Sequence, residues 1–213
     1  MGKFIKGIHG GVSGKVGNVI GSHWKDIDYW RSLARKSNKP ATQKQVDVRY
    51  IFEMVRKFCK PVSALIKLGF ASAKSQTPFN AALAYNISNA VTGLSPNFTI
   101  DFDKVVFSTG PLEKPEGTSA FALTPAKVGA SWREKAGTLG EYKATDEAIL
   151  VIYNTAQKNF VMVENAAVRS DLEASVTMPA DFVGEDVHVW LVFREVGTNR
   201  LSNSVYMGMV TVL

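Results

Sequence analysis

The chain has 213 residues, of which 46% are hydrophobic and 21% are charged, and this composition excludes a mainly disordered protein. The formal net charge is +6, but residues 1–74 hold 15 Lys and Arg against four acids, so the front carries +11 and the rest −5. We therefore expect the front to face a polyanion such as nucleic acid, a charge-complementary subunit, or solvent.

The sequence gives no indication of secretion or of a membrane span. Residues 1–6 lack the apolar stretch of a signal peptide, and the strongest apolar runs, 148–153 and 189–193, are too short to cross a bilayer. Cys59 is the only cysteine, so no intrachain disulfide forms, and its apolar neighbours predict a packed position on a helix. We expect a protein that is cytoplasmic on synthesis.

Residues 2–35 alternate short apolar pairs with seven glycines, a pattern that predicts short strands and tight turns. The next element is a helix from about Thr42 to Lys60, because Pro40 marks a helix start and Thr42 and Gln45 are spaced as a capping box.

The apolar residues of this helix cover more than half of its circumference, so it must be covered on several sides, by its own domain or by neighbouring subunits. They are Val46, Val48, Tyr50, Ile51, Phe52, Met54, Val55 and Phe58. The remaining stripe predicts ion pairs from Glu53 to Arg49 and to Arg56. Weaker helical patterns follow at 61–74 and 78–91, and we expect a domain boundary near 93–96.

From Phe98 onward the apolar residues alternate with period two, which predicts strands. The first runs from Phe98 toward Phe107, and seven more are expected at 119–123, 128–132, 148–153, 160–163, 172–178, 187–194 and 204–212. Short strands at this spacing are typical of an antiparallel sandwich, and both faces of 187–194 are apolar, as in a central strand. The predicted fold is therefore α+β, with a basic strand-and-helix assembly region at 1–95 and an immunoglobulin- or fibronectin-like β-sandwich at 96–213.

We find no catalytic, cofactor or metal pattern in the sequence. Gly14-Lys15 lacks the other residues of a phosphate-binding loop, and His9, His23 and His188 have no partner at ligand spacing. No nucleophile has a recognisable base, so an enzyme is the least expected class. His188 is expected to be a core or interface residue.

One cluster of aromatic and basic residues is a candidate binding surface, for assembly or for a polyanion, because bases stack on aromatic rings while Lys and Arg hold phosphates. The candidate residues are Lys15, Trp24, Lys25, Trp30, Arg31, Arg35, Lys36 and Arg49. The alternative is that Trp24 and Trp30 pack against the helix at 42–60 or against a neighbouring subunit.

Two sets of motifs resemble known families. The first resembles an uncharacterised family of about this length from Bacteroidota and their phages, in Gly7-x-x-Gly10-Gly11-x-x-Gly14-Lys15-Val16-Gly17, Trp24-Lys25, Tyr29-x-Arg31 and Ser202-Asn203-Ser204-x-Tyr206-x-Gly208. The second is similar to the N-terminal motif of small phage virion or tail-region proteins, in Gly14-x-x-Gly17, Arg31 and Pro40-x-Thr42-x-x-Gln45-x-x-x-Arg49-x-x-Phe52. These likenesses imply a virion or assembly component and no catalytic residues.

Three functions are compatible with these observations. The first is a non-enzymatic structural protein that self-associates through its N-terminal region, as a homo-oligomer or with other virion proteins. The second is a nucleic-acid-associated protein that uses the basic track non-specifically. The third is a ligand-binding sandwich that presents aromatic side chains such as Trp132 or Tyr142.

Overall fold

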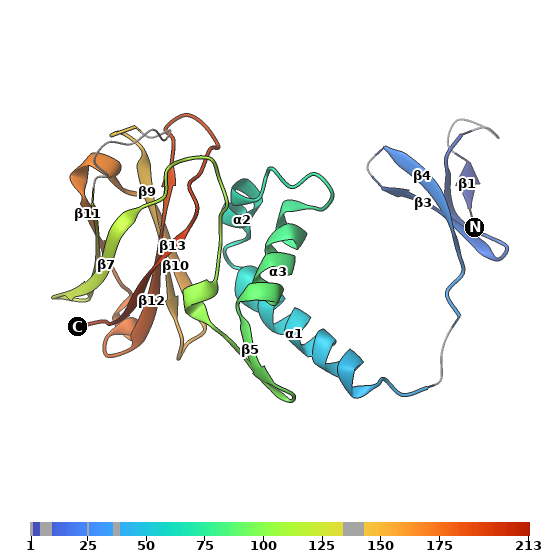
Figure 1. Cartoon of the computed structure of the whole chain (residues 1–213), viewed down its shortest axis with the longest axis horizontal. Coiled ribbons are helices and arrows are strands. Elements are labelled where there is room, and N and C mark those ends of the chain that lie inside the picture. Colours follow the sequence, from blue (N-terminus) through green and yellow to red (C-terminus); the bar gives the residue numbers. More distant parts are fainter. Residues whose placement is uncertain (1, 5–9, 25, 36–38, 134–142) are drawn as a thin grey trace. The chain divides into compact units, whose positions relative to one another are not determined.

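A computed structural model describes residues 2–4, 10–24, 26–35, 39–133 and 143–213 of the chain. It contains two compact units, residues 1–42 and 43–213 (Figure 1). The sequence predicted a boundary near 93–96; in the structure these residues are the end of one strand and the turn of a β-hairpin, within residues 43–213.

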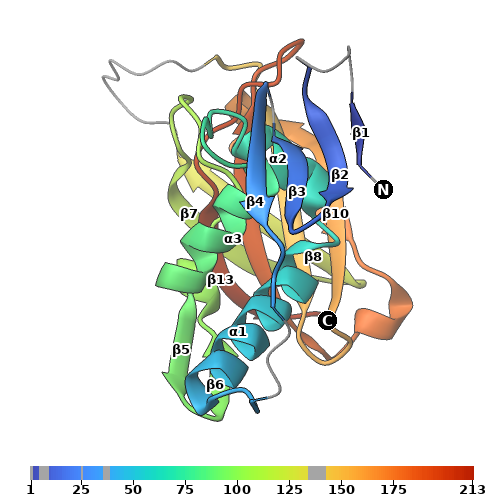
Figure 2. The same ribbon diagram turned by 90° about the vertical axis from the view of Figure 1, so that its right-hand side faces the viewer.

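The N-terminal unit is a four-stranded antiparallel sheet, as the glycine-rich pattern of residues 2–35 predicted. Its strands follow the chain order and lie side by side in Figure 2: β1 (Lys3–Phe4), β2 (Val12–Val16), β3 (Val19–Trp24) and β4 (Ile27–Ser32). Gly17 opens the two-residue turn between β2 and β3 with a φ of +58°, which glycine adopts without strain. Among the described residues of this unit, Val12 is the only buried hydrophobic side chain.

The second unit begins with three helices, α1 (Gln43–Cys59), α2 (Ser63–Gly69) and α3 (Pro78–Asn89). The predicted helix at 42–60 is confirmed as α1. The helix predicted at 61–74 is wrong in its second half, because the Gly69 carbonyl accepts the Thr109 backbone N–H and a Cβ at Gly69 would lie 2.5 Å from the Cβ of Ser108. This close approach to residues 108–109 ends α2.

A hairpin of β5 (Val91–Leu94) and β6 (Asn97–Ile100) follows α3. β5 was not predicted, and the strand predicted from Phe98 toward Phe107 ends at Ile100, since residues Phe102–Lys104 form a short 3₁₀ turn. This turn places the Phe102 ring 4.1 Å from that of His188, centroid to centroid. The aromatic contact is the reason why the chain leaves the strand at Ile100.

The rest of the unit is the predicted β-sandwich. Its strands are β7 (Glu116–Leu123), β8 (Lys127–Arg133), β9 (Glu147–Asn154), β10 (Asn159–Val168), β11 (Glu173–Thr177), β12 (Asp186–Arg194) and β13 (Val205–Thr211). They form two antiparallel sheets, in the orders β11-β8-β7 and β10-β9-β12-β13. The α+β class with a C-terminal sandwich is therefore confirmed.

The four-stranded sheet is buried on both faces. Leu150, Val189 and Leu191 pack toward the three-stranded sheet, whereas Val151, Trp190 and Val192 belong to a second core with the helices. Figure 1 shows α2 and α3 on the side of the sheet opposite to β7 and β11. This layering confirms that β12 is central, and it explains why the helices belong to the same unit as the sandwich.

Cys59 provides a test of how firmly α1 is anchored in this core. Its side chain is fully buried, and desolvation raises the pKa of the thiol to about 12. Only a thiolate reacts with a disulfide reagent, so we expect labelling by DTNB at pH 8 to be roughly 10³-fold slower than for an exposed cysteine. Labelling should become complete in denaturant, and rapid labelling of the native chain would contradict the anchored helix.

Candidate functional site

Alternation along the strands divides the predicted aromatic and basic cluster between two faces of the N-terminal sheet. Pairing between strands places Ile20 between Lys15 and Arg31, Ser22 beside Tyr29, and Trp24 beside Ile27. Paired residues share a face, and so do alternate residues along a strand. These seven residues therefore form one surface, which we call the Arg31 face.

The opposite surface, the Trp30 face, is different in character. Trp30 lies beside Gly21, Val16 lies beside Val19, and His23 lies beside Asp28. The His23 Nδ1 lies 2.7 Å from an Asp28 carboxylate oxygen. Asp28 is the only acid in β2, β3 and β4, so the single negative charge of these strands lies away from Lys15 and Arg31.

The other predicted site residues do not join either face. Arg35 is exposed in the segment that follows β4, and Arg49 is exposed on α1 in the other unit. Lys25 and Lys36 lie outside the described residues. Of the two ion pairs expected for Glu53, the one with Arg56 is confirmed at 2.9 Å, and the second cation at this carboxylate is Lys57, at 3.6 Å, in place of Arg49. Of the predicted residues, Lys15, Trp24 and Arg31 share one surface.

The first half of α1 carries large apolar side chains that its own unit leaves exposed. Val46, Val48, Tyr50 and Phe52 are each 46–66% exposed, whereas Val55, Phe58 and Cys59 in the second half are buried. Figure 1 shows this first half running away from the sandwich beside the β5–β6 hairpin. The hairpin is fixed to the helix, because the Ser95 hydroxyl donates to an Asp47 carboxylate oxygen at 2.9 Å.

These four side chains lie on opposite sides of the helix. Residues two apart are separated by about 200° around a helix, and residues four apart by about 40°. Val46 and Tyr50 therefore form one ridge, the Tyr50 side, and Val48 and Phe52 form another, the Phe52 side. A single flat partner cannot cover both.

An aromatic groove of about 800 Å³ adjoins the Tyr50 side. Its apolar lining comes from α1, β6, the 3₁₀ turn, β9 and β10: Tyr50, Met54, Phe58, Phe98, Ile100, Phe102, Tyr153 and Phe160. This groove was not predicted, because the sequence pattern marks Phe98, Phe102 and Phe160 only as alternating strand residues. No spacing signal links them to α1 before the chain folds.

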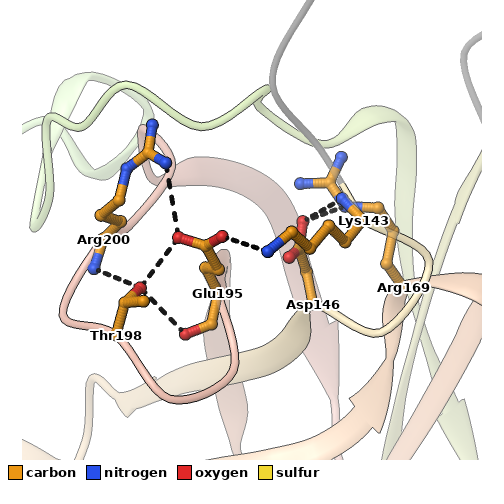
Figure 3. Close-up of polar contacts among 6 residues, drawn as sticks. All are labelled: Lys143, Asp146, Arg169, Glu195, Thr198 and Arg200. Atoms are coloured by element: carbon orange, nitrogen blue, oxygen red, sulfur yellow. Dashed lines mark hydrogen bonds and ion pairs between the residues drawn. The ribbon is translucent and has the colours of Figure 1, made fainter.

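At one end of the sandwich, six residues form a polar cluster that joins three loops (Figure 3). The Lys143 ammonium donates to Glu195 at 2.6 Å, and the Thr198 hydroxyl donates to the other Glu195 oxygen at 3.0 Å. Behind them, the Asp146 carboxylate lies 3.3 Å from the Arg169 guanidinium, and these side chains are only 1% and 9% exposed. The Arg169 guanidinium also lies 3.9 Å from the centre of the Phe193 ring. The sixth residue is Arg200, whose guanidinium donates to Glu195 at 3.4 Å. We call these six residues the loop clamp.

The pKa shifts in the loop clamp are those of ion pairs. Hydrogen bonds from Lys143 and then Thr198 lower the pKa of Glu195, while the hydrogen bond to Glu195 raises the pKa of Lys143. Both shifts move the pKa values of these side chains further from neutral pH, whereas a general acid or base works best with a pKa near the working pH. The clamp therefore stabilises the loops and does not provide a poised proton donor or acceptor.

The remaining candidate groups are parts of the core. His188 Nδ1 lies 2.7 Å from the Tyr206 hydroxyl, and desolvation lowers the pKa of the imidazole, so His188 is a packed core residue as predicted. Trp132 is buried and its indole N–H donates to the Arg169 carbonyl at 2.8 Å, so the expectation that it is an exposed ligand-binding ring is wrong. Tyr142 lies outside the described residues.

Among the described residues, His, Cys, Asp and Glu side chains do not gather in any group of three or more that could hold a metal ion. Among the helices of the described chain, none combines the length and the apolarity that a membrane span requires.

A family model with the description "Family of unknown function (DUF6266)" matches residues 11–208. The chain belongs to this family. The match confirms the likeness to an uncharacterised family, and it runs from β2 of the N-terminal sheet into β13, the last strand of the sandwich. No curated protein matches the chain.

Proposed function

We propose that this DUF6266 chain is a non-enzymatic structural protein that associates with copies of itself through the first half of α1. The observation that carries the proposal is the pair of opposed apolar ridges, the Tyr50 side and the Phe52 side, on one projecting helix. Aromatic and aliphatic side chains exposed in this way are typical of buried interfaces, where they contribute most of the binding energy.

The geometry favours a head-to-tail contact. Because the two ridges point in opposite directions, the Phe52 side of one copy meets the Tyr50 side and the aromatic groove of the next. The same contact then repeats from copy to copy. Such a heterologous interface generates a closed ring where the rotation between copies closes, and an open filament where it does not.

Rings and filaments are the forms that a phage virion or tail component takes, and the likeness of the N-terminal motif to such proteins supports this more specific assignment. The proposed partners are further copies of the chain or other virion proteins. Nothing in the proposal requires a cofactor.

The proposal is tested by the mass of the untagged, nuclease-treated protein in light scattering over a wide concentration range. We expect species well above the 23.3 kDa of one chain, and we expect them to persist in high salt because the contact is apolar. Electron microscopy of these species should show rings or filaments. A monomer at every concentration would refute self-association.

A further inference from the structure

We propose that the Arg31 face of the N-terminal sheet binds single-stranded nucleic acid. This inference is independent of the proposed assembly, because it concerns the other unit of the chain. It rests on three features of this face: the sign of its charge, its exposed aromatic rings and their spacing.

Charge in this chain is concentrated in the unit that carries the Arg31 face. Residues 1–42 contain eight Lys and Arg and two Asp, so they hold the entire formal net charge of +6, while residues 43–213 are balanced. On the face itself, Lys15 and Arg31 lie on either side of Ile20 across three strands, and both are exposed. With the only acid of these strands on the Trp30 face, the surface complements a phosphate backbone.

The same face presents two aromatic rings to solvent. Trp24 is 46% exposed and Tyr29 is 42% exposed, with Ile27 beside Trp24. Along β4 the positions 27, 29 and 31 follow at intervals of about 7 Å, so the Trp24 row, the Tyr29 row and the Arg31 row are evenly spaced. A strand whose bases stack on the first two rows has its phosphates within reach of the cations in the third.

The exposed rings favour single strands over duplexes. Base faces are accessible to an aromatic side chain only where the bases are unpaired and splayed, whereas in a duplex they stack on one another. A purely basic surface would bind both forms through their phosphates. Preference for single strands therefore distinguishes this face from a basic tail.

The test is fluorescence anisotropy of the full chain with a short fluorescein-labelled oligodeoxythymidylate and with a duplex of the same length, at several salt concentrations. We expect the single strand to bind more tightly than the duplex. Arg31→Gln should reduce the slope of the logarithm of the binding constant against the logarithm of the salt concentration by about 0.7, the contribution of one phosphate contact. Arg35→Gln is the matched control, since Arg35 is also exposed but lies outside the sheet. It should change the slope less.

Stacking of bases on Trp24 can be measured separately from the phosphate contacts. Trp24→Leu should weaken binding by at least about 5-fold, while Trp24→Phe should retain it because a π-face remains. In a Trp30→Phe variant, Trp24 is the only exposed tryptophan, because Trp132 and Trp190 are buried. Quenching of Trp24 fluorescence by the oligonucleotide then reports stacking, even if the Trp24→Leu variant folds poorly.

Equal binding of duplex and single strand, equal effects of Arg31→Gln and Arg35→Gln, or unquenched Trp24 fluorescence would each overturn the proposal. Variants of α1 that remain monomeric should bind as well as the native chain, which separates this test from that of assembly.

Discussion

Two α1 variants that each fail to assemble alone should pair with each other when mixed. Phe52→Glu places a charge on the Phe52 side and leaves the Tyr50 side intact, and Tyr50→Glu does the reverse. Loss of a central aromatic anchor costs at least about 2 kcal/mol, so each variant should associate more than about 30-fold more weakly than the native chain. In the mixture, the intact Phe52 side of one variant meets the intact Tyr50 side of the other.

The product of mixing distinguishes a head-to-tail contact from a symmetric one. Because each partner keeps one working side, the mixture should stop at a heterodimer of twice the 23.3 kDa chain mass, measured by light scattering. The matched control is Ala84→Glu, which adds the same charge at an exposed position of α3 and should leave assembly unchanged. Two variants that remain monomeric after mixing would exclude the repeating contact.

Elements with a strong local pattern were predicted closely from the sequence. The start signal at Pro40 and Thr42 placed α1 within one residue, and period-two alternation located the seven strands of the sandwich. The prediction failed where tertiary contacts decide the local structure. Gly69 ends α2 because it packs against Ser108, and Phe102 leaves the strand to pack on His188, and neither contact has a signal in the nearby sequence.

For the candidate surfaces too, the local pattern was predicted from the sequence and the tertiary arrangement was not. The cluster of aromatic and basic residues at 23–36 was recognised from composition, but only strand pairing assigns Trp24 and Trp30 to opposite faces and brings Lys15 beside Ile20. The wide apolar surface of α1 was predicted in full. Which half of it the unit covers depends on where the sandwich ends, so the sequence alone could not identify Val46, Val48, Tyr50 and Phe52 as the exposed set.

Breaking the buried pair of the loop clamp should be the most destabilising change in the second unit. Arg169→Met leaves the Asp146 carboxylate buried without its cation, and Asp146→Asn leaves the guanidinium without its anion. Removing one partner of a buried ion pair costs about 3–5 kcal/mol, because the remaining charge stays desolvated. We expect each variant to lose this much free energy of unfolding in urea, followed by the fluorescence of the buried Trp132 and Trp190.

The double variant and a surface control show whether burial is the cause. With both charges removed, the Arg169→Met and Asp146→Asn double variant should lose clearly less than the sum of the two single losses, since no unpaired charge remains. Lys143→Gln removes an exposed partner of the same clamp and should cost less than about 1 kcal/mol. If Arg169→Met cost no more than Lys143→Gln, the buried pair would not hold the loops. The Arg169 backbone carbonyl, which accepts the Trp132 indole N–H, would then join the clamp to the sandwich, since this hydrogen bond survives in Arg169→Met whereas the side-chain hydrogen bond to the Glu113 carbonyl does not.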